Sequence, residues 1–120
     1  MADLILVTRV ERPAPGTRLW GPNNRLLTEA EITGLVSIYW PANEVAHAKA
    51  VSLCESGLWT GAWAWEKEDS RGLFQINVEA HADMGQYDPF DAQINCYWAH
   101  ALWAAQGWGP WTCAHVLHIV

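Results

Sequence analysis

A glutamate followed by serine and glycine, at positions 55–57, is the pattern in this chain that could do acid–base chemistry. An alanine-rich helical stretch precedes Glu55, and Gly57 suits the left-handed residue that ends a helix, so the carboxylate falls in the last helical turn. The helix dipole and apolar neighbours such as Trp59 and Trp63 both favour the protonated acid there. An acid that stays protonated near neutral pH can protonate a glycosidic oxygen.

A second group of carboxylates follows in the segment EKED, as Glu66, Glu68 and Asp69. Acidic residues in a polar loop are usually only solvated. An inverting glycosidase, however, needs a base roughly 6.5 to 9.5 Å from its acid, with a water molecule between them. The segment offers three candidates for such a base, with a solvated loop as the alternative.

Three sequence blocks occur in a specific order: the Glu55–Ser56 pair, GLFQIN at 72–77, and FDAQIN at 90–95 followed by WAHALWAAQGWGPW. Over roughly residues 28–113 they resemble the goose-type lysozymes, the soluble lytic transglycosylase domain and the related domains of phage lysins and tail proteins. The resemblance implies a mainly α (α+β), lysozyme-like fold with a small β-hairpin wall beside the cleft. It also implies cleavage of the β-1,4 bond between N-acetylmuramic acid and N-acetylglucosamine in peptidoglycan.

The resemblance assigns roles to individual residues. It makes Glu55 the general acid, makes Ser56 a residue that helps to hold the site, and places Gln75 and Asn95 among the substrate-binding residues. Glu66 stands where goose-type lysozymes have a second acidic residue, so we expect Glu66 to be the base and Asp69 its reserve. Asn77, which we also expect to bind substrate, stands where those enzymes have an Asp, so the role of base cannot be transferred to it.

The nine tryptophans are more than a chain of this size needs. Trp98, Trp103, Trp108 and Trp111 fit core positions. Trp59 and Trp63 flank the expected acid, where an indole can stack on a sugar ring, although core packing is an equal alternative for either residue.

Hydrolysis is favoured over transglycosylation because the EKED segment offers a base. A lytic transglycosylase needs only one Glu, since the 6-hydroxyl of the muramic acid attacks its own anomeric carbon. The net charge of −6 is unexpected for a protein that meets an anionic wall. A catalytically weak wall-binding module, such as a piece of a phage tail, is therefore a further alternative.

Composition and helix signals indicate one domain, because 51% of the residues are hydrophobic and 17% are charged. We expect residues 1–27 to be an arm packed on a catalytic domain of residues 28–120, with a possible strand in LILVTRV. Thr28 and Glu31 predict a capping box. The helices expected after it span 28–40, 42–56 and about 91–106.

The N-terminus lacks a recognisable signal-peptide cleavage site, so we expect synthesis in the cytoplasm and action on the cell wall. Buried thiols are then expected for Cys54, Cys96 and Cys113, with a Cys54–Cys96 bridge as the alternative. We expect no cofactor, no metal, no nucleic-acid partner, no membrane span and a monomer whose partner is bacterial peptidoglycan.

Overall fold

The structure, a computed structural model, describes residues 19–120. The possible strand LILVTRV, at 4–10, lies outside the described residues. The α-helices are α2 (Glu29–Tyr39), α3 (Val45–Ser56), α4 (Ala92–Gln106) and α5 (Thr112–Val116), and two 3-10 helices span Ala42–Glu44 and Ala82–Gln86. The strands are β1 (Leu19–Trp20), β2 (Ala62–Ala64), β3 (Ser70–Arg71) and β4 (Ile76–Asn77).

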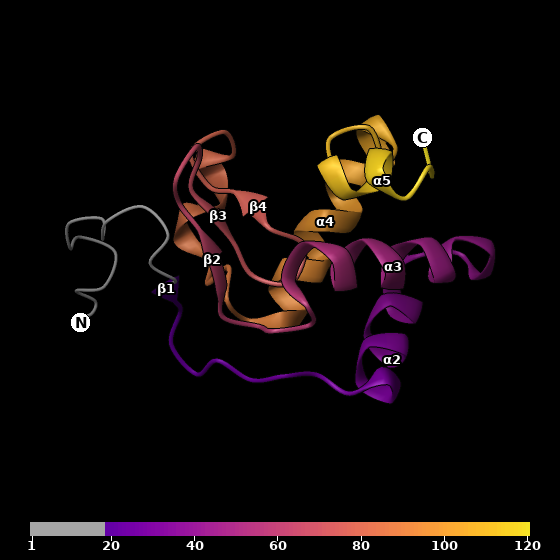
Figure 1. The fold of residues 1–120 in the computed structure, drawn as a ribbon, viewed down its shortest axis with the longest axis horizontal. Helices are drawn as coiled ribbons and strands as arrows, with labels where there is room; N and C mark the ends of the chain where they lie inside the picture. Colours follow the sequence, from indigo (N-terminus) through magenta and orange to yellow (C-terminus); the bar gives the residue numbers. More distant parts are fainter. Residues whose placement is uncertain (1–18) are drawn as a thin grey trace.

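The helices gather on one side of the molecule and the strands on the other (Figure 1). The strands form one antiparallel sheet in the order β1-β2-β3-β4. The expected small β wall is therefore present, and it is larger than one hairpin. Its first strand comes from the segment before α2, where Leu19 pairs with Trp63 and Trp20 with Ala62.

Helix α2 begins with the predicted capping box. The Thr28 hydroxyl accepts a hydrogen bond from the Glu31 amide at 3.1 Å, and the Glu31 carboxylate accepts one from the Thr28 amide at 2.9 Å. The hydrogen bond from the Thr28 backbone amide and the hydrogen bond from the Arg25 guanidinium lower the pKa of Glu31. Because Pro41 cannot continue the helix, α2 ends at Tyr39.

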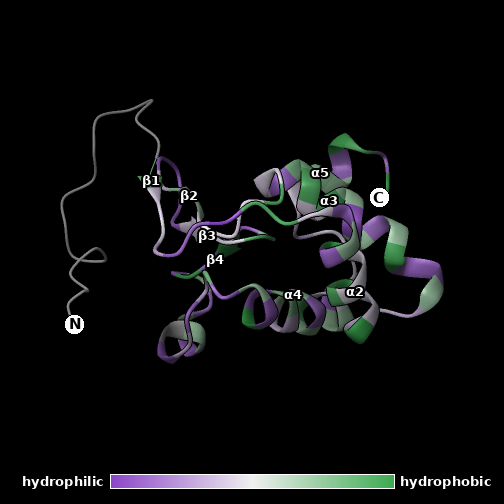
Figure 2. Cartoon of the chain, turned by 90° about the horizontal axis from the view of Figure 1, so that it is seen from below, coloured by the Kyte–Doolittle hydropathy of each residue, from purple (hydrophilic) through white to green (hydrophobic). Residues whose placement is uncertain are grey.

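Helix α3 carries Glu55 and ends at Gly57, as predicted. Gly57 adopts a left-handed conformation, φ +64°, and donates to the Leu53 carbonyl at 2.8 Å. The expected helix over 42–56 is in fact a 3-10 turn, Ala42–Glu44, followed by α3. Ala48, Val51 and Ser52 line the buried face of α3, and helices α2 to α5 each carry both hydrophobic and hydrophilic residues (Figure 2).

Aromatic side chains fill the centre of the helical part. The Trp40 ring stacks on Phe74 and on Trp108, with centroid distances of 5.3 and 5.7 Å, and Trp108 packs on Trp111 at 5.3 Å. The two indole N–H groups of Trp108 and Trp111 donate to the Glu44 carboxylate and the Phe74 carbonyl. The core positions predicted for Trp108 and Trp111 are confirmed.

A smaller apolar cluster supports the sheet. Trp63, Trp65 and Phe90 are buried there, and Leu19 of β1 packs against them. None of the helices in the described part of the chain is long and apolar enough to span a lipid bilayer.

Candidate functional site

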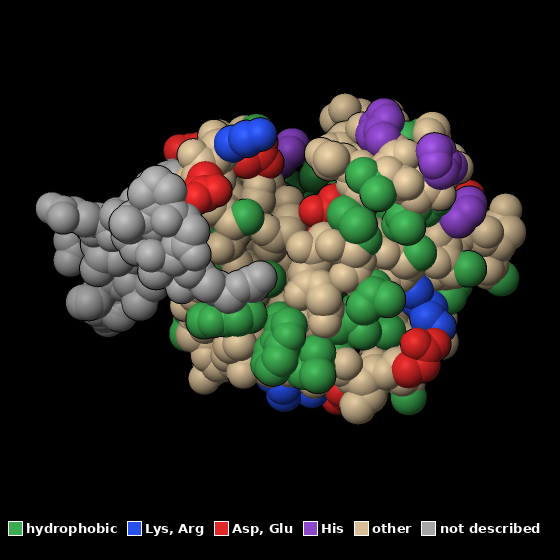
Figure 3. Space-filling model, in the orientation of Figure 1, with side chains coloured by type: hydrophobic (Ala, Val, Ile, Leu, Met, Phe, Trp, Pro, Cys, Tyr) green, Lys and Arg blue, Asp and Glu red, His purple; other side chains and the backbone are tan. Residues whose placement is uncertain are grey.

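A cleft of about 1080 Å³ lies between the C-terminal end of α3 and the sheet. Residues 53–57 line one wall, residues 62–68 and 75–77 line the other, and residues 110–112 close one end. The space-filling view shows a hollow between the two parts of the molecule, with acidic side chains on both of its sides (Figure 3). The acids that line the cleft are Glu55 on the helix and Glu66 and Glu68 on the opposite wall.

Glu55 is half-buried in this cleft, in the last turn of α3. Its Oε2 accepts a hydrogen bond from the Cys113 backbone amide at 3.2 Å. Burial raises the pKa of Glu55, and the negative charge of Glu68 raises it further, while the hydrogen bond from Cys113 acts in the opposite direction. The net effect is a carboxyl group that holds its proton to higher pH than an ordinary Glu.

Ser56 is buried beside Glu55, and its hydroxyl is used within the protein. The Oγ atom donates to the Ser52 carbonyl at 2.9 Å and accepts from the Leu58 amide at 3.2 Å. Leu58, like Gly57, has a positive φ, +69°. Ser56 therefore stabilises the sharp turn after Glu55.

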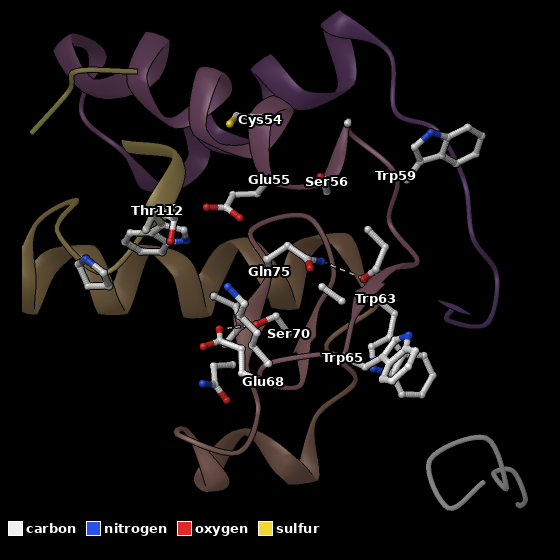
Figure 4. Close-up of a pocket in the computed structure, with 18 of the residues that line it drawn as sticks. Cys54, Glu55, Ser56, Trp59, Trp63, Trp65, Glu68, Ser70, Gln75 and Thr112 are labelled. Carbon is white, nitrogen blue, oxygen red and sulfur yellow. Dashed lines mark hydrogen bonds between the residues drawn. The ribbon is translucent and has the colours of Figure 1, made fainter. Parts of the chain in front are cut away.

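Glu68 faces Glu55 across the cleft (Figure 4). Its Oε2 accepts a hydrogen bond from the Ser70 hydroxyl at 2.7 Å. It is the carboxylate whose charge acts on the pKa of Glu55. The EKED segment thus supplies an acid opposite Glu55, but sequence reasoning chose Glu66 and Asp69 in its place. Glu66 is exposed and also lines the cleft.

Asp69 is held by Arg71 and Trp63 and is not among the residues that line the cleft. Both carboxylate oxygens accept hydrogen bonds from Arg71 at 2.8 Å, and the Trp63 indole N–H donates to Oδ1 at 2.8 Å. The Arg71 guanidinium also lies 4.3 Å from the centroid of the Trp63 ring. A carboxylate so neutralised is a poor base, and the expectation that Asp69 could serve as a reserve is corrected.

The tryptophans near Glu55 divide into two kinds. Trp63 is buried, with an exposed fraction of 8%, and belongs mainly to the cluster under the sheet, so the core alternative describes it better. Trp59 is exposed, lines the cleft and meets Trp20 edge to face at 5.6 Å. Trp20 also lines the cleft. Sequence reasoning missed Trp20 because nothing in the local pattern links β1 to the site.

Gln75 and Asn77 both line the cleft from the GLFQIN block. The Gln75 side-chain amide donates to the Ala62 and Gly72 carbonyls at 3.0 and 2.9 Å, and the first of these bonds connects it to β2. The Asn77 Oδ1 accepts from the amides of Glu79 and Ala80 and caps the turn that follows β4. Both side chains are half-buried and help to shape the wall that carries them.

Asn95 does not line the cleft. It is fully buried, and its amide group accepts from Phe74 N–H and donates to the carbonyls of Arg71 and Pro89, all within 2.9 Å. The expectation that Asn95 binds substrate is therefore corrected. Asn95 fixes the backbone of the GLFQ turn from below, because its three hydrogen bonds join segments that are distant in the sequence.

The cysteines differ from expectation. Cys54 and Cys113 form a disulfide, with Cα atoms 6.0 Å apart, and Cys96 is the free cysteine. The buried thiol expected for Cys96 is thus confirmed, whereas the free thiols expected for Cys54 and Cys113 and the alternative Cys54–Cys96 bridge are wrong. Cys96 is fully buried in the core, where burial raises the pKa of its thiol to about 12. Within residues 19–120, no group of three His, Cys, Asp or Glu side chains is arranged to hold a metal ion.

A helix end that carries a desolvated glutamate, set against a small antiparallel sheet across a cleft, is the arrangement of a lysozyme-like domain. Residues 37–113 match the family model described as a lysozyme-like domain. This match covers more than half of the chain, so the chain belongs to the lysozyme-like domain family, and the expected fold class is confirmed. No curated protein and no solved structure matches it. Family membership supports action on peptidoglycan, by muramidase or transglycosylase chemistry.

Proposed function

We propose that this domain cleaves the β-1,4 bond between N-acetylmuramic acid and N-acetylglucosamine in bacterial peptidoglycan, with Glu55 as the general acid. The raised pKa of Glu55 in the cleft carries this proposal, because a carboxyl group that keeps its proton can protonate the leaving oxygen. General acid catalysis of this kind typically contributes about 10²- to 10⁴-fold to a rate.

For the reaction itself we propose hydrolysis, with Glu68 as the base that activates water. Glu68 lies across the cleft from Glu55, and its carboxylate accepts a hydrogen bond from the Ser70 hydroxyl. An inverting muramidase requires two carboxyl groups on opposite sides of the scissile bond, one as the general acid and one as the base that activates water. Glu66, which lines the same wall, is the second candidate for this role.

Sugar binding is assigned to the exposed aromatic pair of Trp20 and Trp59. Indole faces stack on the apolar faces of sugar rings, and both residues line the cleft while keeping exposed fractions of 39% and 36%. This contact does not depend on net charge, so it can hold an anionic glycan on a domain of charge −6. Trp20→Ala is expected to raise KM more than it lowers kcat.

A lytic transglycosylase is the second candidate, and one observation favours it. Glu66 and Glu68 both lie on an exposed stretch of the wall, whereas Glu55 is the group that the cleft desolvates. A reaction in which the substrate's own 6-hydroxyl is the nucleophile needs no second carboxylate. The products separate the two reactions, because hydrolysis adds water to the new reducing end and transglycosylation leaves a 1,6-anhydro end.

The test is digestion of purified peptidoglycan by the purified domain, followed by mass spectrometry of the soluble muropeptides. Wild type should release fragments, and Glu55→Gln should release them at least about 100-fold more slowly while remaining folded. Asp83→Asn removes one negative charge from an exposed residue outside the cleft and is the matched control. A folded Glu55→Gln variant with wild-type activity would remove Glu55 from the mechanism, and wall binding without cleavage by wild type would contradict the enzymatic proposal.

A further inference from the structure

We propose that the Cys54–Cys113 disulfide is a positioning device for the general acid. The bridge holds the Cys113 backbone amide against the Glu55 carboxylate, and breaking it slows glycan cleavage. This inference rests on the proposed role of Glu55 and adds to it a residue pair outside the set expected from the sequence.

The geometry places both ends of the bridge at Glu55. Cys54 directly precedes Glu55 in the last turn of α3, and Cys113, on α5, is the residue whose N–H donates to Glu55 Oε2 at 3.2 Å. The two Cα atoms are 6.0 Å apart. The end of α3 and the start of α5 are thus joined twice: by the disulfide at Cys54, next to Glu55 in the chain, and by the hydrogen bond from the Cys113 amide to the Glu55 carboxylate.

The Cys113 amide is available for this contact because it lies in the first turn of α5. Amides in a first turn have no acceptor within their own helix. A helix of five residues has little stability of its own, so its place is fixed by tertiary contacts. The bridge is the covalent one among these contacts, and it acts at the residue that binds Glu55.

Other contacts keep α5 near the cleft when the bridge is broken. Trp111 and Ala114 are buried in the core, and the Trp111 indole donates to the Phe74 carbonyl at 2.9 Å. These contacts are expected to keep the domain folded after reduction. What the reduced form loses is the constraint on Cys113, and a small displacement there breaks the bond to Glu55.

The hydrogen bond has an electrostatic effect that can be measured. An N–H donor favours the charged carboxylate and lowers the pKa of Glu55, in opposition to burial and to Glu68. Loss of the donor leaves the two raising effects, so the pKa of Glu55 rises and its side chain gains rotational freedom. Correct orientation of a catalytic group can be worth about 100-fold in rate.

Other ionisable groups near Glu55 lie on the walls of the cleft and on the elements packed against α3. Those that line the cleft with it are Glu66, Lys67, Glu68 and His81. On the elements packed against α3, the groups are engaged elsewhere: Glu29 with Lys49, Glu31 with Arg25, Glu44 with Trp108 and His47, Tyr39 with Gln93, and His115 with the Gly109 carbonyl. Reduction adds thiols at Cys54 and Cys113 beside these groups, so a change in the Glu55 titration that also occurs in Cys54→Ala/Cys113→Val, which has no thiol at either position, reports on the Cys113 contact.

Cys54 is exposed, so a reductant can reach the bridge. Reduction by a dithiol such as dithiothreitol transfers two electrons and two protons to the sulfurs, giving two thiols and the cyclic disulfide of the reagent. Disulfides persist in oxidising surroundings and are rare in the reducing cytosol. The device would make the acid well positioned at the cell wall and poorly positioned in a reducing compartment.

The experiment compares oxidised wild type, dithiothreitol-reduced wild type and Cys54→Ser. For each form, the rate of muropeptide release is measured against pH, and the Glu55 side chain is titrated by carboxyl ¹³C NMR, with its signal assigned from Glu55→Gln. We expect reduction and Cys54→Ser each to slow release about tenfold or more and to raise the pKa of Glu55. Reoxidation should restore the wild type but not Cys54→Ser. Cys96→Ala, which leaves the bridge intact, should respond to reductant as the wild type does.

The outcomes separate this inference from the proposed function. An oxidised wild type that cleaves glycan, and whose reduced folded form has the same rate and the same Glu55 titration, overturns the inference alone. An oxidised wild type that cleaves nothing contradicts the proposed function, while the NMR titration still tests the Cys113 contact. If near-UV circular dichroism shows that reduction unfolds the wild type, the folded variant Cys54→Ala/Cys113→Val gives the same comparison.

Discussion

The backbone amide of Cys113 donates a hydrogen bond to the carboxylate of Glu55, 58 positions earlier in the chain. The contact joins the end of α3 to the beginning of α5 and brings a C-terminal segment into the wall of the cleft. Glu55 is thus subject to opposing influences, since the cleft desolvates it and the amide stabilises its charge. The balance between these two influences sets the pKa of Glu55, on which the proposed acid catalysis depends.

Glu55→Gln is expected to stabilise the protein at neutral pH. The raised pKa means that the folded state binds this proton more tightly than the unfolded chain does, so its contribution to stability is present at low pH and is lost as the pH rises through the folded pKa. A neutral Gln can still accept from Cys113 and is not subject to this loss. Thermal unfolding should give a higher Tm for the variant at pH 7 and a smaller difference near about pH 4. A lower Tm at pH 7 would contradict the desolvation of Glu55.

The activity should be highest on the acidic side of neutrality. Glu55 must be protonated to act, so the rate falls as the pH rises through its raised pKa. A pH profile of muropeptide release by wild type should decline on the alkaline side. A rate that still increased towards about pH 9 would be inconsistent with an acid of this kind.

Glu68→Gln should slow hydrolysis about 100-fold, because the variant cannot take a proton from water. Gln at this position can still accept from the Ser70 hydroxyl, so the local structure is kept. Glu66→Gln is the matched comparison on the same wall and should have a smaller effect. Anhydro products from wild type, together with an unchanged rate in Glu68→Gln, would assign the domain to the lytic transglycosylases.

Gly72→Ala should destabilise the fold by at least about 2 kcal/mol. Gly72 has a φ of +81°, and a Cβ atom there would lie 2.2 Å from both the Asn95 side-chain nitrogen and the Pro89 carbonyl. Urea unfolding measures the change. Gly34→Ala in α2 is the control, because its Cβ would meet nothing within 4 Å and a helical Gly→Ala change is expected to stabilise by roughly 0.5–1 kcal/mol. Equal effects of the two substitutions would show that the GLFQ turn does not need glycine.

Reduction of the Cys54–Cys113 bridge should lower the free energy of unfolding by about 2–4 kcal/mol, since it links residues 59 positions apart. This corresponds to a fall in Tm on the order of 10 °C. Three free thiols, in contrast, would leave the stability of the protein unchanged when reductant is added. Mass spectrometry of the oxidised protein should give a mass lower than the reduced one by two hydrogens, and a protein found fully reduced after oxidative refolding would show that the bridge does not form.

Local signals in the sequence were sufficient for the element that carries the acid. The capping box of Thr28 and Glu31, the end of α3 at Gly57 and the position of Glu55 in its last turn all depend on interactions within a few residues. The mainly helical fold with a small sheet followed from the ordered sequence blocks and is confirmed by the family match. Short-range hydrogen bonds and backbone preferences are encoded where they act, so they can be read from the sequence.

Tertiary structure alone decided which side chains meet at the site. The partner of Cys54 is Cys113 and not Cys96, because α5 lies beside the end of α3 while Cys96 faces the core. The Asn95 side chain forms hydrogen bonds with the backbone of Phe74 and Arg71, at the GLFQ turn, and does not line the cleft.

Tertiary contacts also decided which carboxylate acts on Glu55. Arg71 neutralises Asp69 and leaves Glu68 as the carboxylate whose charge reaches Glu55, and β1 brings Trp20 to the cleft. The residues involved are of the types expected for this chemistry. Their roles depend on burial and on contacts between segments distant in the chain, and those exist only once the helices and the sheet have packed together.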